Sequence, residues 1–226
     1  MKRNFKYFIV FLIVPIVLAI GVVLFHDRQY ALISLAIALL SCLLFFFRFE
    51  HKTHSSRELI AIAAMVALSS AGRFIFAMVP GFKPVTAIVV ISAIYFGSES
   101  GFLVGSLSAV VSNMYFGQGP WTPFQMFSWG IIGFIAGLLA GHLKNSRMLT
   151  AAYGAVSGIL FSIIMDIWTV IWWDGSFNSN RYLGAIISSI PFMAVYVVSN
   201  ALFIFILYKP IGRKLERLKI KYGIGG

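Results

Sequence analysis

The chain has 226 residues, of which 60% are apolar and 11% charged, and its formal net charge at pH 7 is +11. A mean hydropathy of +0.91 excludes a soluble globular domain, because runs of about 20 apolar residues are long enough to cross a bilayer. No sizeable polar segment interrupts these runs, so the chain is predicted to be a single membrane domain. In such a protein the positive charges indicate topology rather than nucleic-acid binding.

Apolar segments taken in chain order predict eight transmembrane helices, and hence an all-α, polytopic membrane helix bundle. The segments cover residues 8–25, 31–47, 59–79, 84–97, 101–116, 124–141, 149–172 and 183–208. The first segment also resembles a signal peptide. Its apolar run is longer than usual for one, and Ala19-Ile20-Gly21 is a poor cleavage site, so an uncleaved anchor is expected.

The basic residues lie mainly in alternate loops. Fourteen of the 18 Lys and Arg residues fall before the first span, after the second, after the sixth and in the C-terminal tail. The positive-inside rule therefore predicts that both termini are cytoplasmic. Residues 84–116 could instead form one long helix, but that would put the basic residues after the sixth and eighth spans outside. A hairpin that turns between Phe96 and Gly101 is therefore expected.

Three loops on the predicted outer side, 80–84, 116–127 and 172–181, hold most of the non-helical polar and aromatic groups. The central one contains Gly117-Gln118-Gly119-Pro120-Trp121-Thr122-Pro123-Phe124-Gln125. Its two prolines and two glycines forbid a continuous helix. It carries amides and rings without charge, which is the composition of a lid or pocket wall for a largely uncharged organic ligand. The alternative is an interfacial turn in the aromatic belt.

Arg73 and Asp166 are the two charged residues well inside predicted spans. Each costs about 2.5–3.5 kcal/mol at a helix centre on insertion scales, so such residues indicate function by default. Counting the helical rise puts both, together with Asn113, in the outer half of the bundle. The alternative is an Arg73–Asp166 ion pair that only fixes helix packing. Asn200 is expected to form hydrogen bonds between helices.

Small residues spaced four apart predict close helix packing, since such ridges let backbones approach in lipid. The glycine sets are 97, 101 and 105; 133, 137 and 141; and 154 and 158. Ala63, Ala67 and Ala71 form a similar smooth stripe. Inside the bundle this stripe would be ordinary packing, whereas on the outside it would be a docking face for another membrane protein.

The sequence contains no recognised catalytic motif. It has no GxxxxGK[ST], HExxH or GxSxG pattern, so the chain is not expected to be an enzyme or to hydrolyse ATP itself. Its four histidines and the single Cys42 show no metal-ligand spacing, and no metal or cofactor is expected. No convincing internal repeat of the kind seen in many secondary transporters is present.

From Glu58 onward the chain resembles the substrate-binding S-component of an energy-coupling factor (ECF) vitamin transporter. The resemblance rests on six spans, the alanine stripe and the outer loops. The strings Gly72-Arg73-Phe74, Phe82-Lys83-Pro84 and residues 117–125 are similar to the subgroup associated with cobalamin or related corrinoid precursors.

The resemblance covers residues 58–208 and implies a six-helix substrate-binding core there. Residues 1–57, an extra N-terminal pair of transmembrane helices with a cytoplasmic linker, depart from the six-span pattern. Residues 209–226 are expected to be a basic cytoplasmic tail. It implies a subunit of an ABC importer in the cell membrane. That subunit captures a vitamin outside and delivers it inward by toppling, with a scaffold protein and two ATPases that use the ATP. The stripe of Ala63, Ala67 and Ala71 would contact the scaffold.

The predicted ligand contacts combine the intramembrane polar residues with those of the outer loops. They are Arg73, Lys83, Asn113, Gln118, Trp121, Gln125, Asp166 and Asn178. Two rival functions stay open at this point. One is a self-sufficient proton-coupled carrier with Asp166 as the coupling group, and the other is a membrane sensor or assembly factor without a small ligand.

Overall fold

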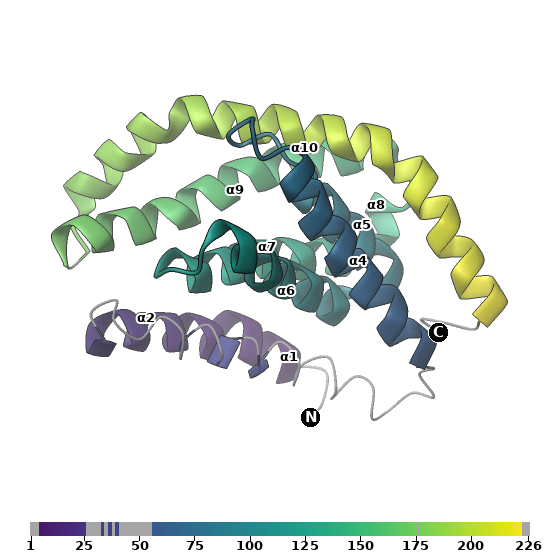
Figure 1. Cartoon of the computed structure of the whole chain (residues 1–226), viewed down its shortest axis with the longest axis horizontal. Helices are drawn as coiled ribbons and strands as arrows, with labels where there is room; N and C mark the ends of the chain where they lie inside the picture. The colour runs from purple at the N-terminus through teal and green to yellow at the C-terminus, as the bar shows by residue number, and fades with distance from the viewer. Residues whose placement is uncertain are drawn as a thin grey trace.

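The computed structural model describes residues 5–25, 56–175 and 177–222, together with positions 33, 36, 37, 39 and 40. All regular secondary structure in these ranges is helical (Figure 1). Most of the second predicted span lies outside the described residues, as do Cys42 and three of the four histidines. Within the described ranges no group of three or more potential metal ligands occurs.

The helices follow the predicted order closely. They are α1 (Phe5–Phe8), the π-helical η1 (Ile9–Ile13), α2 (Val14–Phe25), α4 (Ser56–Ile75), α5 (Val85–Phe96), α6 (Ser98–Phe116), α7 (Trp121–Leu138), α8 (Ala140–Leu143), α9 (Arg147–Asp174) and α10 (Ser179–Tyr222). The expected break between Phe96 and Gly101 is confirmed, because α5 and α6 are separate helices joined at Gly97, whose φ of 93° favours glycine. The last predicted span ends at residue 208, whereas α10 continues through Pro210 to Tyr222.

Helix α5 is the centre of the bundle. All of its 12 residues are buried, and it packs against α4, α6, α7 and α10. A helix that is apolar on every side has to be surrounded by other elements. It is about 18 Å long at 1.5 Å per residue, shorter than the roughly 30 Å of a bilayer's hydrocarbon core. Because neighbouring helices cover α5, its length does not have to match the thickness of the hydrocarbon core.

The predicted number of eight spans is not confirmed. Among the described residues, three helices are long and apolar enough to cross a membrane: Arg57–Ile75 of α4, α9 and α10. Two others, α5 and the run Phe5–Gly21, are shorter apolar helices. Apolar segments that look alike in sequence therefore differ in length once folded, because hydropathy does not distinguish a helix that faces lipid from one enclosed by neighbours.

Helices α6 and α7 touch backbone to backbone through glycines. A Cβ atom added at Gly105 would lie 2.3 Å from the Trp129 carbonyl oxygen, and one at Gly133 would lie 2.3 Å from the Gly101 carbonyl oxygen. Real side chains do not fit at such distances, so the predicted close packing is confirmed for these positions. It is wrong for Gly141, where an added Cβ would have no neighbour within 4 Å.

Helix α10 arches over α9 and continues past α5 (Figure 1). The two helices approach closely at Gly158, where an added Cβ would lie 2.8 Å from the Val197 amide nitrogen. Pro191 and Pro210 lie inside α10. Each removes a backbone donor and promotes bending, which accounts for the curvature of this 44-residue helix.

One end of the bundle collects the basic loops and the C-terminal turns of α10. The contacts there are Lys219 Nζ to the Tyr95 carbonyl at 3.0 Å, Lys144 to Glu216 at 2.9 Å, Lys6 to Glu99 at 3.1 Å, and Arg57 4.7 Å from the Tyr222 ring centroid. These residues come from the segments that were predicted to lie on one side of the membrane. We call this region the basic end.

The first helical run lies against α7. Tyr7 and Phe11 both meet the ring of Phe134, with centroids 5.9 and 5.8 Å apart. The 3.1 Å ion pair of Lys6 with Glu99 ties the same run to the start of α6. The N-terminal segment is thus packed on the bundle that follows it.

Candidate binding site

At the end of the bundle opposite the basic end, Arg73 joins α4 to α6. It lies in the last turn of α4, and its Nη1 donates to Ser112 Oγ at 2.6 Å and to Asn113 Oδ1 at 2.7 Å. These two bonds use both hydrogens of Nη1 and leave the other three N–H donors of the guanidinium. No acceptor among the described residues bonds to Nη2 or Nε.

Asn113 carries the network on to α7. This fully buried amide donates from Nδ2 to Thr122 Oγ1 and to Gln125 Oε1, both at 2.9 Å. Its oxygen already accepts a hydrogen bond from Arg73, so this one amide on α6 connects the guanidinium of α4 to α7. A buried amide that makes three hydrogen bonds has a fixed orientation.

The loop between α6 and α7 is folded by the same groups. Thr122 Oγ1 donates to Gln118 Oε1 at 3.1 Å, and Gln118 Nε2 donates to the Val110 carbonyl at 2.9 Å. Gly117 adopts a φ of 95°, which reverses the chain, and α7 starts at Trp121 with Pro123 in its first turn, where proline costs little. The predicted helix break is confirmed.

Lys83 reaches the same region from the loop between α4 and α5. Its backbone N–H donates to Ser199 Oγ on α10 at 2.9 Å, which anchors the loop. Its Nζ lies 5.3 Å from the ring centroid of Tyr196 and 5.8 Å from that of Trp129. Burial and, secondarily, the positive charge of Arg73 lower the pKa of Lys83 from 10.5 to about 7.

Trp129 lies near both basic side chains. The Arg73 guanidinium carbon is 5.5 Å from its ring centroid, and the indole is 1% exposed. The ring stacks on Phe161 at 5.1 Å, and Phe161 in turn meets Tyr196 at 5.1 Å. These aromatic residues were missed in the sequence. Trp129 follows Gln125 by four residues on one helix face, which was a usable signal, whereas Tyr196 carried none.

We call Arg73, Lys83, Asn113, Gln125 and Trp129 the Trp129 cluster. The structure thus brings together four of the eight predicted ligand contacts, drawn from α4, the loop after it, α6 and α7. Gln118 is connected to the cluster through Thr122. The role of each of these side chains in binding a ligand stays a prediction.

The other three predicted contacts have different partners. Trp121 packs edge-to-face on Trp168 of α9, with centroids 5.9 Å apart. Asp166 accepts a hydrogen bond from Ser189 Oγ at 2.7 Å, and the ion pair with Arg73 that the sequence left open is not formed. Asn178 Oδ1 accepts the Arg181 backbone N–H at 3.1 Å at the start of α10.

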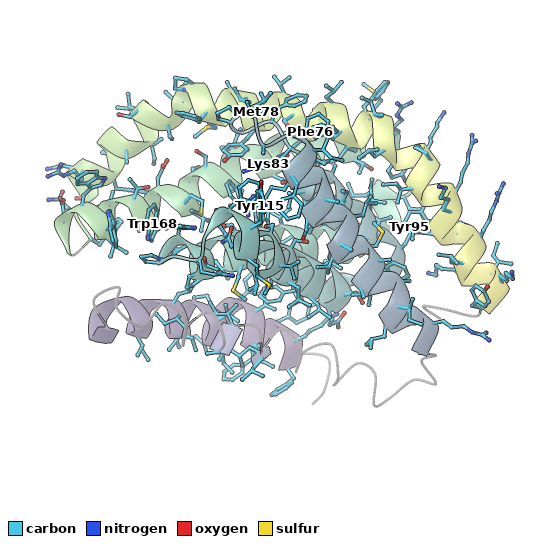
Figure 2. All side chains as sticks on the ribbon, viewed as in Figure 1. Phe76, Met78, Lys83, Tyr95, Tyr115 and Trp168 are labelled. Atoms are coloured by element: carbon cyan, nitrogen blue, oxygen red, sulfur yellow. The ribbon has the colours of Figure 1, made fainter. Side chains whose placement is uncertain are left out.

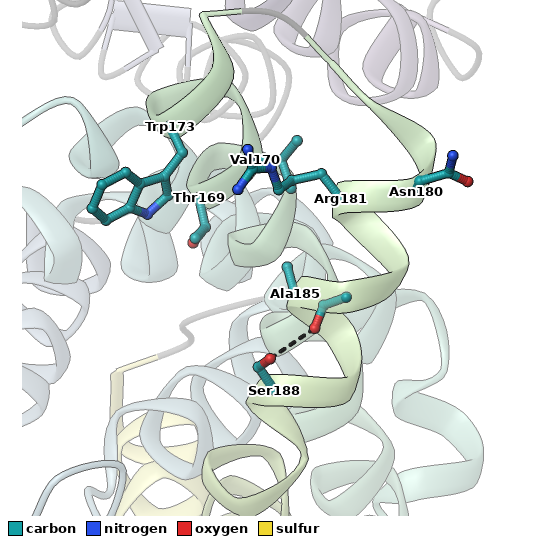
Figure 3. Close-up of a pocket in the computed structure, with 8 residues that line it drawn as sticks. Thr169, Val170, Trp173, Asn180, Arg181, Ala185 and Ser188 are labelled. Atoms are coloured by element: carbon teal, nitrogen blue, oxygen red, sulfur yellow. Dashed lines mark hydrogen bonds between the residues drawn. The ribbon is translucent and has the colours of Figure 1, made fainter.

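A separate groove of about 460 Å³ lies between the C-terminal part of α9 and the N-terminal part of α10 (Figure 3). Residues that line it are Thr169, Val170, Trp173, Asn180, Arg181, Gly184, Ala185 and Ser188. Its one charged side chain, Arg181, is already paired with Asp174 at 3.0 Å. The groove contains none of the predicted contacts, and it lacks the convergent polar groups of the Trp129 cluster.

Replacing Asn113 with Leu is expected to destabilise the protein by about 2–3 kcal/mol, because Arg73 Nη1 and Gln125 Oε1 would lose buried partners. The unfolding midpoint in mild detergent should fall by about 4–10 °C. Asn145→Leu is the control, since Asn145 is exposed and its side chain makes one hydrogen bond, to the Gly141 carbonyl. Equal midpoints for the two variants would contradict a structural role for the Asn113 network.

The chain is similar to a family of known proteins over the part that holds these features. A family model described as ECF-type riboflavin transporter, S component, matches residues 53–216, which include the whole Trp129 cluster. A UPF0397 protein of Vibrio atlanticus (strain LGP32) is 28% identical over 147 residues, covering 63% of this chain and 78% of the relative. UPF0397 proteins of Aliivibrio fischeri (strain MJ11) and Aliivibrio salmonicida (strain LFI1238) are 26% and 25% identical, covering 63% of this chain and 78% and 77% of their own lengths. No solved structure matches the chain.

Proposed function

The chain belongs to the family described as ECF-type riboflavin transporter, S component, and on that premise we propose that it captures a vitamin outside the cell for an ECF-type ABC importer. In this role it is the substrate-binding subunit and not an enzyme. A transmembrane scaffold protein and two ATPases complete the importer and use the ATP. The chain lies in the cell membrane with both termini in the cytoplasm.

The Trp129 cluster is the observation that carries this proposal. A cation, two amides and an indole from three helices converge at one end of the bundle, which is the arrangement of a small-molecule site. The basic end lies opposite. If the basic end faces the cytoplasm, as the positive-inside rule requires, the cluster lies toward the outer side of the membrane.

The alanine stripe supports a scaffold partner. Ala63, Ala67 and Ala71 are all exposed on α4 and lie on one side of that helix. Small side chains let another membrane helix approach closely, and close packing drives association in lipid. We propose that this face contacts the scaffold protein.

Riboflavin and cobalamin are the two candidate substrates. The sequence strings resemble the cobalamin-type subgroup, while the family description names riboflavin. Cobalamin specificity has no support from the family match, so riboflavin is the first compound to test and cobalamin the second. Competition of each unlabelled vitamin against the other would rank them.

Uptake of radiolabelled riboflavin or cobalamin into proteoliposomes is expected only when this chain, the scaffold, both ATPases and ATP are present together. Uptake by the chain alone, driven by a proton gradient and abolished in Asp166→Asn, would instead establish the proton-coupled carrier. A ligand that binds the folded state raises its apparent stability. If no vitamin in a broad panel stabilises the protein against thermal unfolding, the membrane sensor is favoured.

A further inference from the structure

Arg73 and Lys83 are two half-buried basic residues that lie close to the same aromatic ring. Among the described residues, neither forms an ion pair with an Asp or Glu side chain. Asp166, which the sequence offered as a possible partner of Arg73, accepts a hydrogen bond from Ser189 instead. Charges held away from water are normally paired, because desolvation is costly. A negative charge on a bound ligand would balance them, and it would favour the protonated form of Lys83, whose pKa is lowered by burial.

Both charges face the same indole. Arg73 Cζ and Lys83 Nζ lie 5.5 and 5.8 Å from the Trp129 ring centroid. They are close enough for the charge of Arg73 to lower the pKa of Lys83. The aromatic rings of Trp129, Phe116 and Tyr196 offset part of this cost through cation–π contacts, but they supply no negative charge.

The donors that stay open suit an anion. Arg73 keeps Nη2 and Nε, the edge of the guanidinium that binds carboxylate or phosphate in a bidentate manner. Lys83 offers its Nζ from the loop between α4 and α5, where Phe76 and Lys83 are labelled in Figure 2. Ser112 and Asn113 fix the guanidinium from the other side, so its orientation is set before a ligand arrives.

We propose that Arg73 and Lys83 form a subsite for an anionic group, a carboxylate or a phosphate, of the compound that this protein binds. The proposal rests on the proposed function and names its substrate class as an organic anion with an apolar body. The anion supplies a negative charge that no described Asp or Glu side chain provides at this place, and the two basic side chains hold it near Trp129. The central outer loop indicated an uncharged ligand, so the two cations add a feature that its composition did not show.

Thermal unfolding in mild detergent tests the subsite with sodium phosphate and sodium acetate as probes, against sodium chloride at the same ionic strength. Saturable stabilisation by either probe is expected, and Arg73→Gln and Lys83→Gln should each weaken the apparent affinity about 10- to 100-fold. Lys83→Arg, which keeps the charge, should retain binding. Lys209→Gln, at an exposed position on α10, is the matched control.

The two probes distinguish the sources of the anion, since preference for phosphate indicates a phosphorylated ligand and preference for acetate a carboxylic acid. Flavin mononucleotide and riboflavin, which differ by one phosphate, extend the test to an organic body. Stabilisation by neither anion, or stabilisation that persists in both Gln variants, would overturn the subsite. ATP-dependent uptake of a neutral vitamin would then still support the proposed function, whereas anion binding without partner-dependent uptake would support the subsite alone.

Discussion

Ala67→Trp is expected to abolish ATP-dependent vitamin uptake while ligand binding by the isolated subunit stays within about twofold of the parent protein. Ala67 is exposed in the middle of the stripe on α4, so the described part of the chain leaves room for a larger side chain there. Against a scaffold helix, however, an indole prevents the close approach that small residues permit. Uptake into proteoliposomes and ligand binding in detergent measure the two effects separately.

Ala152→Trp provides the matched control, because Ala152 is equally exposed but lies on α9, away from the stripe. This variant is expected to transport normally. Co-purification of the subunit with its scaffold should fail for Ala67→Trp and succeed for Ala152→Trp. Normal uptake by Ala67→Trp would show that the stripe on α4 is not the docking face.

Gly105→Val is expected to destabilise the protein by about 3 kcal/mol or more, since overpacking at a close contact forces helices apart. The first added carbon would lie 2.3 Å from the Trp129 carbonyl oxygen and 2.7 Å from the Gly130 amide nitrogen. Backbone atoms cannot move aside as a flexible side chain can. An unfolding midpoint lowered by about 6–12 °C is the expected measurement.

Displacement at Gly105 should also disturb ligand binding, because the carbonyl it would strike belongs to Trp129, the centre of the Trp129 cluster. Gly141→Val separates packing from helix propensity, since an added Cβ at Gly141 has no neighbour within 4 Å. That variant carries the same β-branched residue and is expected to unfold near the parent midpoint. A drop of equal size in both variants would argue against close α6–α7 packing as the cause.

Four of the five residues of the Trp129 cluster could be predicted from the sequence. Arg73 and Asn113 stood out because polar side chains are expensive inside apolar segments, and Lys83 and Gln125 stood out beside loop breakers. Trp129, Ser112 and Thr122 did not, since an indole or a hydroxyl in a membrane helix is ordinary. Their importance depends on which residues face them across helices, and that is not a local property.

The partners of Asp166 and Trp121 also could not be predicted from local sequence. Depth in the membrane put Asp166 level with Arg73, but rotation of α9 aims the carboxylate at Ser189 on α10. Trp121 follows the loop whose Gln118 is connected to the Trp129 cluster, yet the ring of Trp121 faces Trp168 on α9. Counting residues along an axis gives height and leaves the direction of each side chain open.

The sequence by itself determined the helical class, the order of the helices, the breaks near Gly97 and Gly117, and close packing at glycines spaced four apart, with Gly141 as the exception. These follow from local chemistry: apolar length, prolines, glycines and small residues every fourth position. Tertiary structure alone decided that α5 is enclosed, that α10 continues to Tyr222, and that Arg73 and Lys83 meet one indole with no carboxylate of the described residues beside them. Those outcomes depend on how the helices are rotated and spaced against one another, which is set by packing over the whole bundle.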